Sequence, residues 1–386
     1  MRQPVTRREV LRGGLAAAAL ASMGIPEWAL PALAQGEELV PFTDFPANFN
    51  PNPSPIVRFV DTRTIDSFYT PADKWFTIQH YGQPDVDLGA YKLKITGMLS
   101  SPREYTLDEL MRKPKVELPV GFECSGNSKA RMHGLVSNGR WTGVRLSTLL
   151  KEAGMQAGAR EVVFYGADKG TEEISHGSPA QKVEQHFARS LATEDASKPE
   201  VFLAYHLNGA PLTKNQGSPL RLITPGWYGV ANVKWLQRIH LQDRRFMGRF
   251  MARDYVTLRA RDINGETEWT ESSVGRIQLK SIVVRVTRMA VAMKVTGFAL
   301  TDTTPLKAVE VKVDNGPWQA AEIDKQSTDT SWKLFTYRWQ GASPGGHSIV
   351  SRAIDINGNV QPAEEDSTKK TRWENNAQLV RTVMVS

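Results

Sequence analysis

Residues 121–134, "GFECSGNSKARMHG", contain the only cysteine among the 386 residues of this chain. A lone cysteine is most often a small buried hydrophobe. Here Cys124 is followed by Ser, Gly and Asn, a turn-forming sequence that is more typical of a loop than of a strand interior. Three kinds of chemistry come into question for this thiol: nucleophilic catalysis, zinc binding and ligation of another transition metal.

A Cys-His-Asn protease would use one of four histidines, His80, His133, His176 or His186, but no cysteine-protease signature surrounds the thiol. Zinc would need companion Cys and His residues at short fixed spacings, and the sequence has none. A soft thiolate can instead be one ligand of a transition metal whose other ligands come from a cofactor. In that case a single cysteine is enough.

The first 34 residues predict an exported protein. Arg7 and Arg8 precede an apolar run of Gly, Ala and Leu that ends in the small residues Ala32–Ala34. This segment looks like a twin-arginine signal peptide, which predicts a periplasmic location and a protein that is folded around its cofactor before export. The alternative is an uncleaved membrane anchor, for which the apolar run is short.

Composition excludes some classes of function. The formal net charge is +7 at pH 7, but no block of like charges occurs and the aromatic residues are not interleaved with basic ones. Nucleic-acid binding therefore has little support. No later segment approaches the roughly 18 consecutive apolar residues of a transmembrane helix, so we expect no membrane span in the mature chain.

The remaining residues predict two domains after an arm. Residues 35–74 are rich in Pro and Asn and are expected to lie extended over a surface. In residues 75–270, short β-type runs alternate with helical ones, one of which begins with a capping box of Thr106 and Glu109. Residues 275–386 contain only strand patterns separated by turn residues. We therefore predict an α+β domain followed by a β-sandwich of immunoglobulin type.

Six segments in order, "WFTIQHYGQP", "ECSGN", "GRWTGVRLSTLL", "AYHLNGAPLTKNQGSPLRLITPGWYGVANVKWL", "FMARDY" and "RAIDINGNVQP", resemble the sulfite oxidase family. Residues 75–270 are similar to its molybdopterin-binding domain, and residues 275–386 to its dimerisation domain. The resemblance implies a molybdenum–molybdopterin cofactor with Cys124 as the protein's ligand to the metal. It also implies two-electron oxygen-atom transfer on sulfite or another sulfur compound, in a homodimer. Because no haem-binding "CxxCH" occurs, the electrons would pass to a separate periplasmic cytochrome c.

The same resemblance assigns site residues one by one. The catalytic set is Tyr255, Cys124, Lys129 and Arg131, the last two as alternatives for a substrate-binding arginine. The cofactor-binding set is Phe76, Gln79, His80, Cys124, Asp168, Gln216, Arg221, Asn232, Val233 and Lys234. Arginine and lysine among them suit the anionic tail of a pterin.

Three positions depart from the family pattern. Ile78 and the region of Asn376 stand where anion-binding arginines are expected, and Gln216 replaces a histidine. We therefore expect poor binding of the sulfite dianion. One alternative is a molybdenum-dependent sulfoxide or N-oxide reductase acting on a neutral substrate, which Ile78 would suit. Another alternative, of a different class, is a cofactor-free exported binding protein with the same fold.

Overall fold

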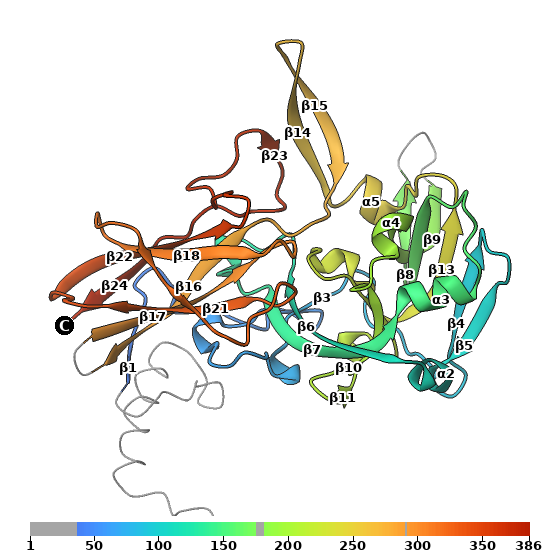
Figure 1. Ribbon diagram of the computed structural model, residues 1–386, viewed down its shortest axis with the longest axis horizontal. Helices are drawn as coiled ribbons and strands as arrows, with labels where there is room; N and C mark the ends of the chain where they lie inside the picture. Colours follow the sequence, from blue (N-terminus) through green and yellow to red (C-terminus); the bar gives the residue numbers. More distant parts are fainter. Residues whose placement is uncertain (1–36, 175–180, 290–291) are drawn as a thin grey trace, which may run out of the picture.

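The computed structural model describes residues 37–174, 181–289 and 292–386. Strands dominate the described chain (Figure 1). The helical content is lower than the α+β expectation suggests, because the α-helices of the described residues have only four to seven residues. The expected export signal at residues 1–34 lies outside the described residues.

Two sheets form the part of the fold that carries the cysteine. The first consists of β6 (Lys115–Glu123), β7 (Val136–Arg145), β10 (Phe202–Leu207), β11 (Ala210–Pro211) and β12 (Arg221–Ile223). The second consists of β4 (Lys92–Gly97), β5 (Arg103–Thr106), β8 (Glu161–Ile174), β9 (Gln181–Ala192) and β13 (Leu236–Gln242). In the second sheet β13 runs parallel to β4, and the other strand pairs are antiparallel.

Short helices connect these strands. They are α2 (Leu107–Arg112), α3 (Leu146–Glu152), α4 (Thr193–Ala196) and α5 (Arg249–Ala252). The capping box predicted for the first of them is present: the Thr106 hydroxyl accepts from the backbone N–H of Glu109, whose carboxylate accepts from the Thr106 N–H. In α3 the N-cap is Arg145, which makes no side-chain capping bond.

The C-terminal part of the chain forms two further sheets. One consists of β1 (Glu38–Val40), β16 (Lys280–Met289), β17 (Ala292–Leu300), β20 (Glu322–Ile323) and β21 (Lys333–Trp339). The other consists of β18 (Leu306–Val313), β19 (Gln319–Ala320), β22 (Gly345–Asp355) and β24 (Arg381–Val385). Apolar residues of both sheets, among them Val283, Val295, Val309 and Ile349, share one buried core. The strands expected after residue 275 therefore occur, and they pack as two layers.

The prediction that residues 35–74 lie extended over a surface was wrong for the first described residues of this segment. Residues 38–40 form β1, which pairs antiparallel with β16, and Phe42 bridges to Val383. The cause is apolar burial, because Val40, Phe42 and Phe45 join the core of the C-terminal sheets. This segment is a packed part of the fold rather than a surface layer.

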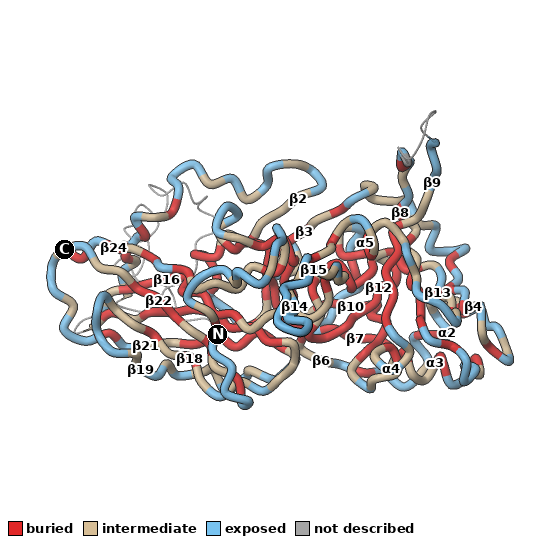
Figure 2. Tube along the Cα trace, turned by 90° about the horizontal axis from the view of Figure 1, so that it is seen from above, coloured by how far each residue is buried: buried red, intermediate tan, exposed pale blue. Residues whose placement is uncertain are grey.

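The two halves of the molecule share buried surface. Ile282, Val284 and Trp332 of the C-terminal half belong to the same core cluster as Trp141 and Phe202. The indole Nε1 of Trp332 also donates to the carbonyl of Phe68 at 2.9 Å. Figure 2 shows buried residues running along the strands of both halves. The C-terminal half can therefore place residues next to the cysteine.

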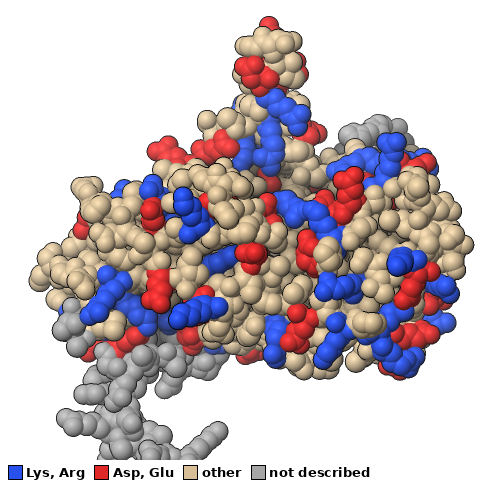
Figure 3. Space-filling model, in the orientation of Figure 1, with Lys and Arg blue, Asp and Glu red and all other residues tan. Residues whose placement is uncertain are grey.

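One hairpin projects from this body (Figure 1). It consists of β14 (Val256–Ile263) and β15 (Glu266–Ser273), and β23 (Lys369–Lys370) pairs with its base. On the face drawn in Figure 3, Lys and Arg are mixed with Asp and Glu rather than gathered in one patch. Within residues 37–174, 181–289 and 292–386, no helix has the length and apolar character needed to cross a membrane.

Candidate active site

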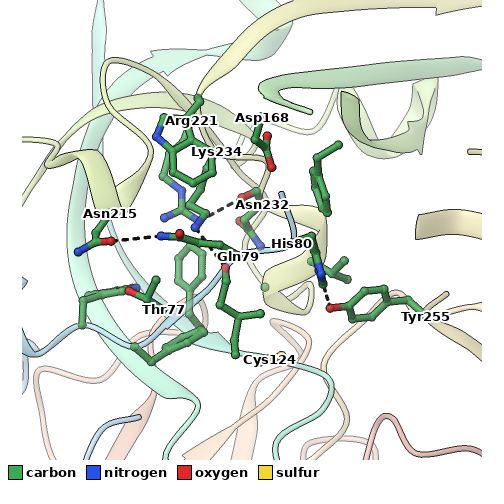
Figure 4. A pocket seen from close by; sticks show the side chains of 18 residues that line it. Thr77, Gln79, His80, Cys124, Asp168, Asn215, Arg221, Asn232, Lys234 and Tyr255 are labelled. Carbon is green, nitrogen blue, oxygen red and sulfur yellow. Dashed lines mark hydrogen bonds between the residues drawn. The ribbon is translucent and has the colours of Figure 1, made fainter. Parts of the chain in front are cut away.

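A pocket opens where the end of β6, the short strand β3 (Thr77–Ile78) and the 3-10 helix η6 (Gly229–Ala231) meet (Figure 4). Its lining residues surround about 690 Å³ of space free of protein atoms, part of it open to solvent. Figure 4 shows three groups of side chains around it: Arg221 with Lys234 and Asp168, then Cys124, then His80 with Tyr255.

Cys124 follows the last residue of β6 and begins a turn. Its backbone N–H donates to Leu135 O at 3.0 Å, and its carbonyl accepts from Asn127 N at 2.9 Å. Burial raises the pKa of the Cys124 thiol to about 11, so a cation is needed to stabilise the thiolate here. Gly229 lies beside this turn: a Cβ there would lie 3.4 Å from the carbonyl oxygen of Glu123, an ordinary van der Waals distance.

Two buried cations lie on one side of the pocket. Arg221 donates to the backbone carbonyls of Gln216 and Asn232, both at 3.0 Å, and Lys234 donates to Ile78 O at 3.2 Å. Burial lowers the pKa of Arg221 to about 9. Burial, followed by the charge of Arg221, lowers the pKa of Lys234 to about 7. Within the described part of the chain, neither cation forms an ion pair with a carboxylate, so the site suits an anionic ligand.

Polar atoms around these cations lack partners. Arg221 Nε, Asp168 Oδ1 and Gln79 Oε1 are buried and make no hydrogen bond. Burial raises the pKa of Asp168 to about 6, against the opposing effect of Lys234. Buried polar groups in folded proteins are nearly always paired, so unpaired ones in a pocket point to a ligand.

His80 and Tyr255 form a hydrogen-bonded pair. The Tyr255 hydroxyl lies 2.9 Å from His80 Nε2, and Phe250 stacks on the imidazole with ring centroids 4.6 Å apart. The imidazole is still accessible from the pocket. Even so, desolvation among the rings, followed by the charge of Lys234, lowers the pKa of His80 to about 4. The ring is therefore neutral at pH 7, and burial raises the pKa of Tyr255 so that its hydroxyl keeps its proton.

The structure brings most of the predicted residues together. Those that line the pocket are Phe76, Gln79, His80, Cys124, Asp168, Arg221, Asn232, Lys234 and Tyr255. Those that do not are Gln216, Val233, Lys129 and Arg131. The first set comes from segments far apart in sequence, which the two sheets place around one space.

Gln216 and Val233 lie next to lining residues but do not line the pocket themselves. The Gln216 side chain is occupied by its own turn, since its amide donates to Ala72 O and its oxygen accepts from Thr213 N, both at 3.0 Å. It supports the site through its backbone carbonyl, which holds Arg221. The backbone N–H and C=O of Val233 bond to Ala231 and Leu222, and its side chain is buried in the core.

The proposed anion-binding positions near the cysteine lie away from the pocket lining. Lys129 and Arg131 belong to the 3-10 helix η4 (Lys129–Arg131) and are exposed, and Arg131 donates to Gly126 O at 3.0 Å. Asn376 donates to Leu279 O instead of reaching the pocket. In contrast, Ile78 is part of the lining.

Sequence reasoning missed several lining residues. Asn215 lies beside the expected Gln216 and accepts from the Gln79 amide at 3.1 Å, and Gly229 lies beside the turn that Cys124 begins. The signal available for Gly229 was its place in the segment "PGWYGVANVKW". Trp373 was also missed: it stacks on Tyr255 with ring centroids 4.3 Å apart. It lies more than one hundred residues from Tyr255 in the sequence, so no local pattern indicated it.

Comparison with known proteins is consistent with this site. Residues 80–250 match the family model described as the oxidoreductase molybdopterin binding domain. The mitochondrial sulfite oxidase of Homo sapiens is 28% identical over 342 residues, covering 81% of this chain and 60% of the relative. The sulfite oxidase of Arabidopsis thaliana is 26% identical over 347 residues, covering 80% of this chain and 86% of the relative. The chain thus spans about 60% of the length of its mitochondrial relatives.

A solved structure has the same fold. The crystal structure of the sulfane dehydrogenase SoxCD from Paracoccus pantotrophus superposes with a TM-score of 0.71 at 23% sequence identity, covering 87% of this chain and 89% of that chain. Residues 80–250 therefore match a molybdopterin-binding oxidoreductase domain, within a fold that this solved structure shares. The chain is similar to the sulfite oxidase family of molybdopterin oxidoreductases, in agreement with the prediction from its sequence motifs.

The residues present fit the molybdenum–molybdopterin cofactor of this family. Arg221 and Lys234 offer unpaired positive charge for the anionic tail, and the unpaired atoms of Gln79 and Asp168 are available to polar pterin groups. Cys124 offers a soft sulfur ligand at another part of the same pocket. Within the described residues, no group of three or more His, Cys, Asp or Glu side chains could hold a metal ion by itself.

Proposed function

We propose that this chain is an exported molybdenum oxidoreductase that transfers an oxygen atom in a two-electron reaction with sulfite or another sulfur compound. The observation that carries the proposal is the joint placement of Cys124, the unpaired cations Arg221 and Lys234, and the His80–Tyr255 pair around one pocket. The relatives named as sulfite oxidases, and the fold shared with a protein named as a sulfane dehydrogenase, support a sulfur-containing substrate.

Each group has a separate task. When bound, the cofactor supplies a metal centre that can exchange an oxygen atom and two electrons with a substrate. Arg221 and Lys234 hold its anionic tail, and Cys124 provides the protein's thiolate ligand. The Tyr255 hydroxyl is oriented by the neutral His80. When His80 carries its proton on Nε2 and donates it to the tyrosine oxygen, the hydroxyl proton of Tyr255 is free to be donated to a substrate oxygen. Trp373 stacks on one face of the Tyr255 ring.

The proposed partner is a separate periplasmic cytochrome c that accepts the electrons one at a time. This rests on the twin-arginine pattern around Arg7 and Arg8 and on the lack of a "CxxCH" haem motif in the sequence. Replacing both arginines by lysine should retain the protein in the cytoplasm, as cell fractionation would show. Fractionation that finds the altered protein in the periplasm would contradict export by this route.

We also propose a homodimer formed through the two-layered C-terminal sheets, as an immunoglobulin-like dimerisation domain. The support is the family resemblance of residues 275–386 together with the two packed sheets and their shared core. Light scattering of the full-length protein at micromolar concentration should give twice the chain mass. A monomer under these conditions would contradict the proposal.

The test of the reaction is steady-state oxidation of sulfite, with cytochrome c or ferricyanide as the acceptor. Turnover of sulfite by the purified protein that carries the cofactor would support the proposal. A protein that carries the cofactor but oxidises neither sulfite nor any other sulfur compound in a substrate screen would contradict it.

A second candidate is reduction of a neutral sulfoxide or N-oxide. It is favoured by Ile78, an apolar residue in the pocket lining, and by the low pKa of His80, which leaves no positive charge on that ring at pH 7. The same centre would then run in the reverse direction with a substrate that needs no anion site. Activity with reduced dyes as donors, in the absence of sulfite oxidation, would select this candidate.

A further inference from the structure

Residues of the C-terminal half of the chain contact the short backbone segment that contains Cys124. Residues 123–127, which we call the cysteine turn, begin with Glu123 directly before Cys124. The Glu123 carboxylate lies 2.5 Å from the Nζ of Lys280, the first residue of β16. The exposed fractions of these two side chains are 0% and 1%, so the ion pair is fully buried between the two halves of the molecule.

This ion pair is connected to the backbone of the turn. The Glu123 oxygen that accepts from Lys280 also accepts from Asn127 Nδ2 at 2.9 Å. Asn127 Oδ1 in turn accepts from the N–H of Leu135 at 3.0 Å, and Leu135 O accepts from the N–H of Cys124 at 3.0 Å. Lys280 is therefore the end of a bonded chain that reaches the backbone of the cysteine.

A second contact comes from the C-terminal segment. The N–H of Glu374 donates to Ser125 O at 2.7 Å, and the Glu374 carboxylate is fixed by Thr257 Oγ1 at 2.9 Å and Arg259 Nη2 at 2.6 Å. The neighbouring Trp373 packs over Gly126, where an added Cβ would lie 3.1 Å from the indole.

Burying such a pair costs desolvation free energy that an apolar pair of the same size would not, so it is weak evidence for stability. In the described part of the chain, Glu123 is the only hydrogen-bond partner of the Lys280 ammonium. Trp373 adds a geometric link, because it also stacks on the ring of Tyr255 with ring centroids 4.3 Å apart. The same segment therefore touches both the cysteine turn and the active-site tyrosine.

We propose that Lys280, Trp373 and Glu374 form a clamp that positions the cysteine turn relative to Tyr255, with Lys280 as its principal positioning residue. The C-terminal half is then part of the redox site as well as a packing partner. The role in turnover rests on the proposed function, but the mechanical role of the clamp does not.

The test compares Lys280→Met with the double variant Glu123→Gln/Lys280→Met. Methionine keeps most of the length of the lysine chain without its charge, and the double variant leaves no unpaired buried charge. Lys333→Met is the matched control, because Lys333 is another buried lysine of the C-terminal half that bonds only Thr301, Asp329 and Ser331 in the described residues. Amide hydrogen exchange of the protein as purified is followed by mass spectrometry for the peptide that contains residues 123–135.

We expect exchange of this peptide to accelerate at least about tenfold in Lys280→Met and in the double variant, while Lys333→Met leaves it unchanged. The double variant should recover thermal stability that Lys280→Met loses. In the holoenzyme, kcat should fall about 10- to 100-fold with KM within about twofold, and the visible thiolate-to-metal absorption should shift.

Wild-type exchange, absorption and kcat in the double variant would overturn the clamp and leave the pair a purely structural feature. If Lys280→Met does not fold, the double variant alone decides. A purified wild-type protein without molybdenum would refute the proposed function, whereas the exchange experiment would still decide on the clamp.

Discussion

The pocket is defined at the scale of single residues by buried cations and by one thiol. In the described residues, Arg221 and Lys234 donate their hydrogen bonds to backbone carbonyls. Their positive charge is therefore available to a ligand. In the described part of the chain, Cys124 forms no hydrogen bond with Arg221 or Lys234. Loss of the thiol should therefore leave the anion-binding part of the pocket intact. Cofactor retention and turnover can therefore be separated by substitution.

Cys124→Ser should give a folded protein that still carries pterin but has no turnover. Serine fits the same space, and Arg221 with Lys234 still holds the anionic tail, whereas the metal loses its soft protein ligand. Pterin fluorescence after acid release and the sulfite assay give the two readouts. Turnover equal to that of the unaltered protein would remove Cys124 from the site.

Ile78→Arg should lower KM for sulfite by about 10- to 100-fold, because a charge-assisted hydrogen bond contributes about 1.5–3 kcal/mol. The backbone carbonyl of Ile78 remains available to Lys234, so the cofactor side is undisturbed. The gain should shrink as salt rises. Ile78→Met is the uncharged control, and equal KM values for the two variants would contradict a missing positive charge as the cause.

His133 should make the fold sensitive to acid. It is 2% exposed, and burial, followed by the charges of Lys280 and Arg381, lowers its pKa well below 6.5. Above pH 6.5 both the folded and the unfolded state are neutral at this residue. As the pH falls below 6.5, the unfolded state gains a proton that the folded state does not take up, so the free energy of unfolding decreases.

The measurement for His133 is urea unfolding at pH 7.5 and pH 5.5. The unaltered protein should lose about 1 kcal/mol more between these conditions than His133→Gln, which cannot titrate. An equal loss in both proteins would show that His133 does not carry the effect.

Ordered motifs in the sequence predicted which residues share the pocket. Cys124, Arg221, Asn232 and Lys234 all line the pocket as expected. The prediction failed for Gln216, because its side chain caps its own turn, a local competition that no motif records. Trp373 could not be found, since only the packing of the two halves brings it to Tyr255.

At the scale of elements, local sequence signals predicted where a helix begins but not which strands pair. The capping box at Thr106 formed as predicted because it needs only residues within one turn. The strand β1 was not predicted, because its three residues become a strand only by pairing with β16. Edge strands of this kind depend on contacts that are distant in sequence.

Thr106→Ala should lower the free energy of unfolding by about 0.5–2 kcal/mol, the usual effect of losing an N-cap. Thr106 lies outside the pocket lining, so kcat and KM should stay unchanged. Thr106→Ser is the control, because serine can still accept from the Glu109 N–H. A serine variant as destabilised as the alanine variant would mean that the lost methyl group, and not the cap, is responsible.

At the scale of the whole molecule, the two halves form one structure around the site. Ile282, Val284 and Trp332 share a core with the cysteine-bearing sheets, and Lys280 and Glu374 contact the cysteine turn. A chain cut near residue 275 would lose part of this core and so could not report on dimer formation alone. The sequence indicated two domains by the change from mixed patterns to strands, but the shared core follows from packing that periodicity does not encode.

The central claim is that the pocket holds a molybdenum–molybdopterin cofactor through Cys124, Arg221 and Lys234. The most direct test is elemental and pterin analysis of the full-length protein purified from a strain that makes the cofactor. We expect about one molybdenum atom and about one pterin per chain, with both reduced in Arg221→Met/Lys234→Met. A pure, folded protein from such a strain without molybdenum and pterin would contradict it and would favour the cofactor-free binding protein instead.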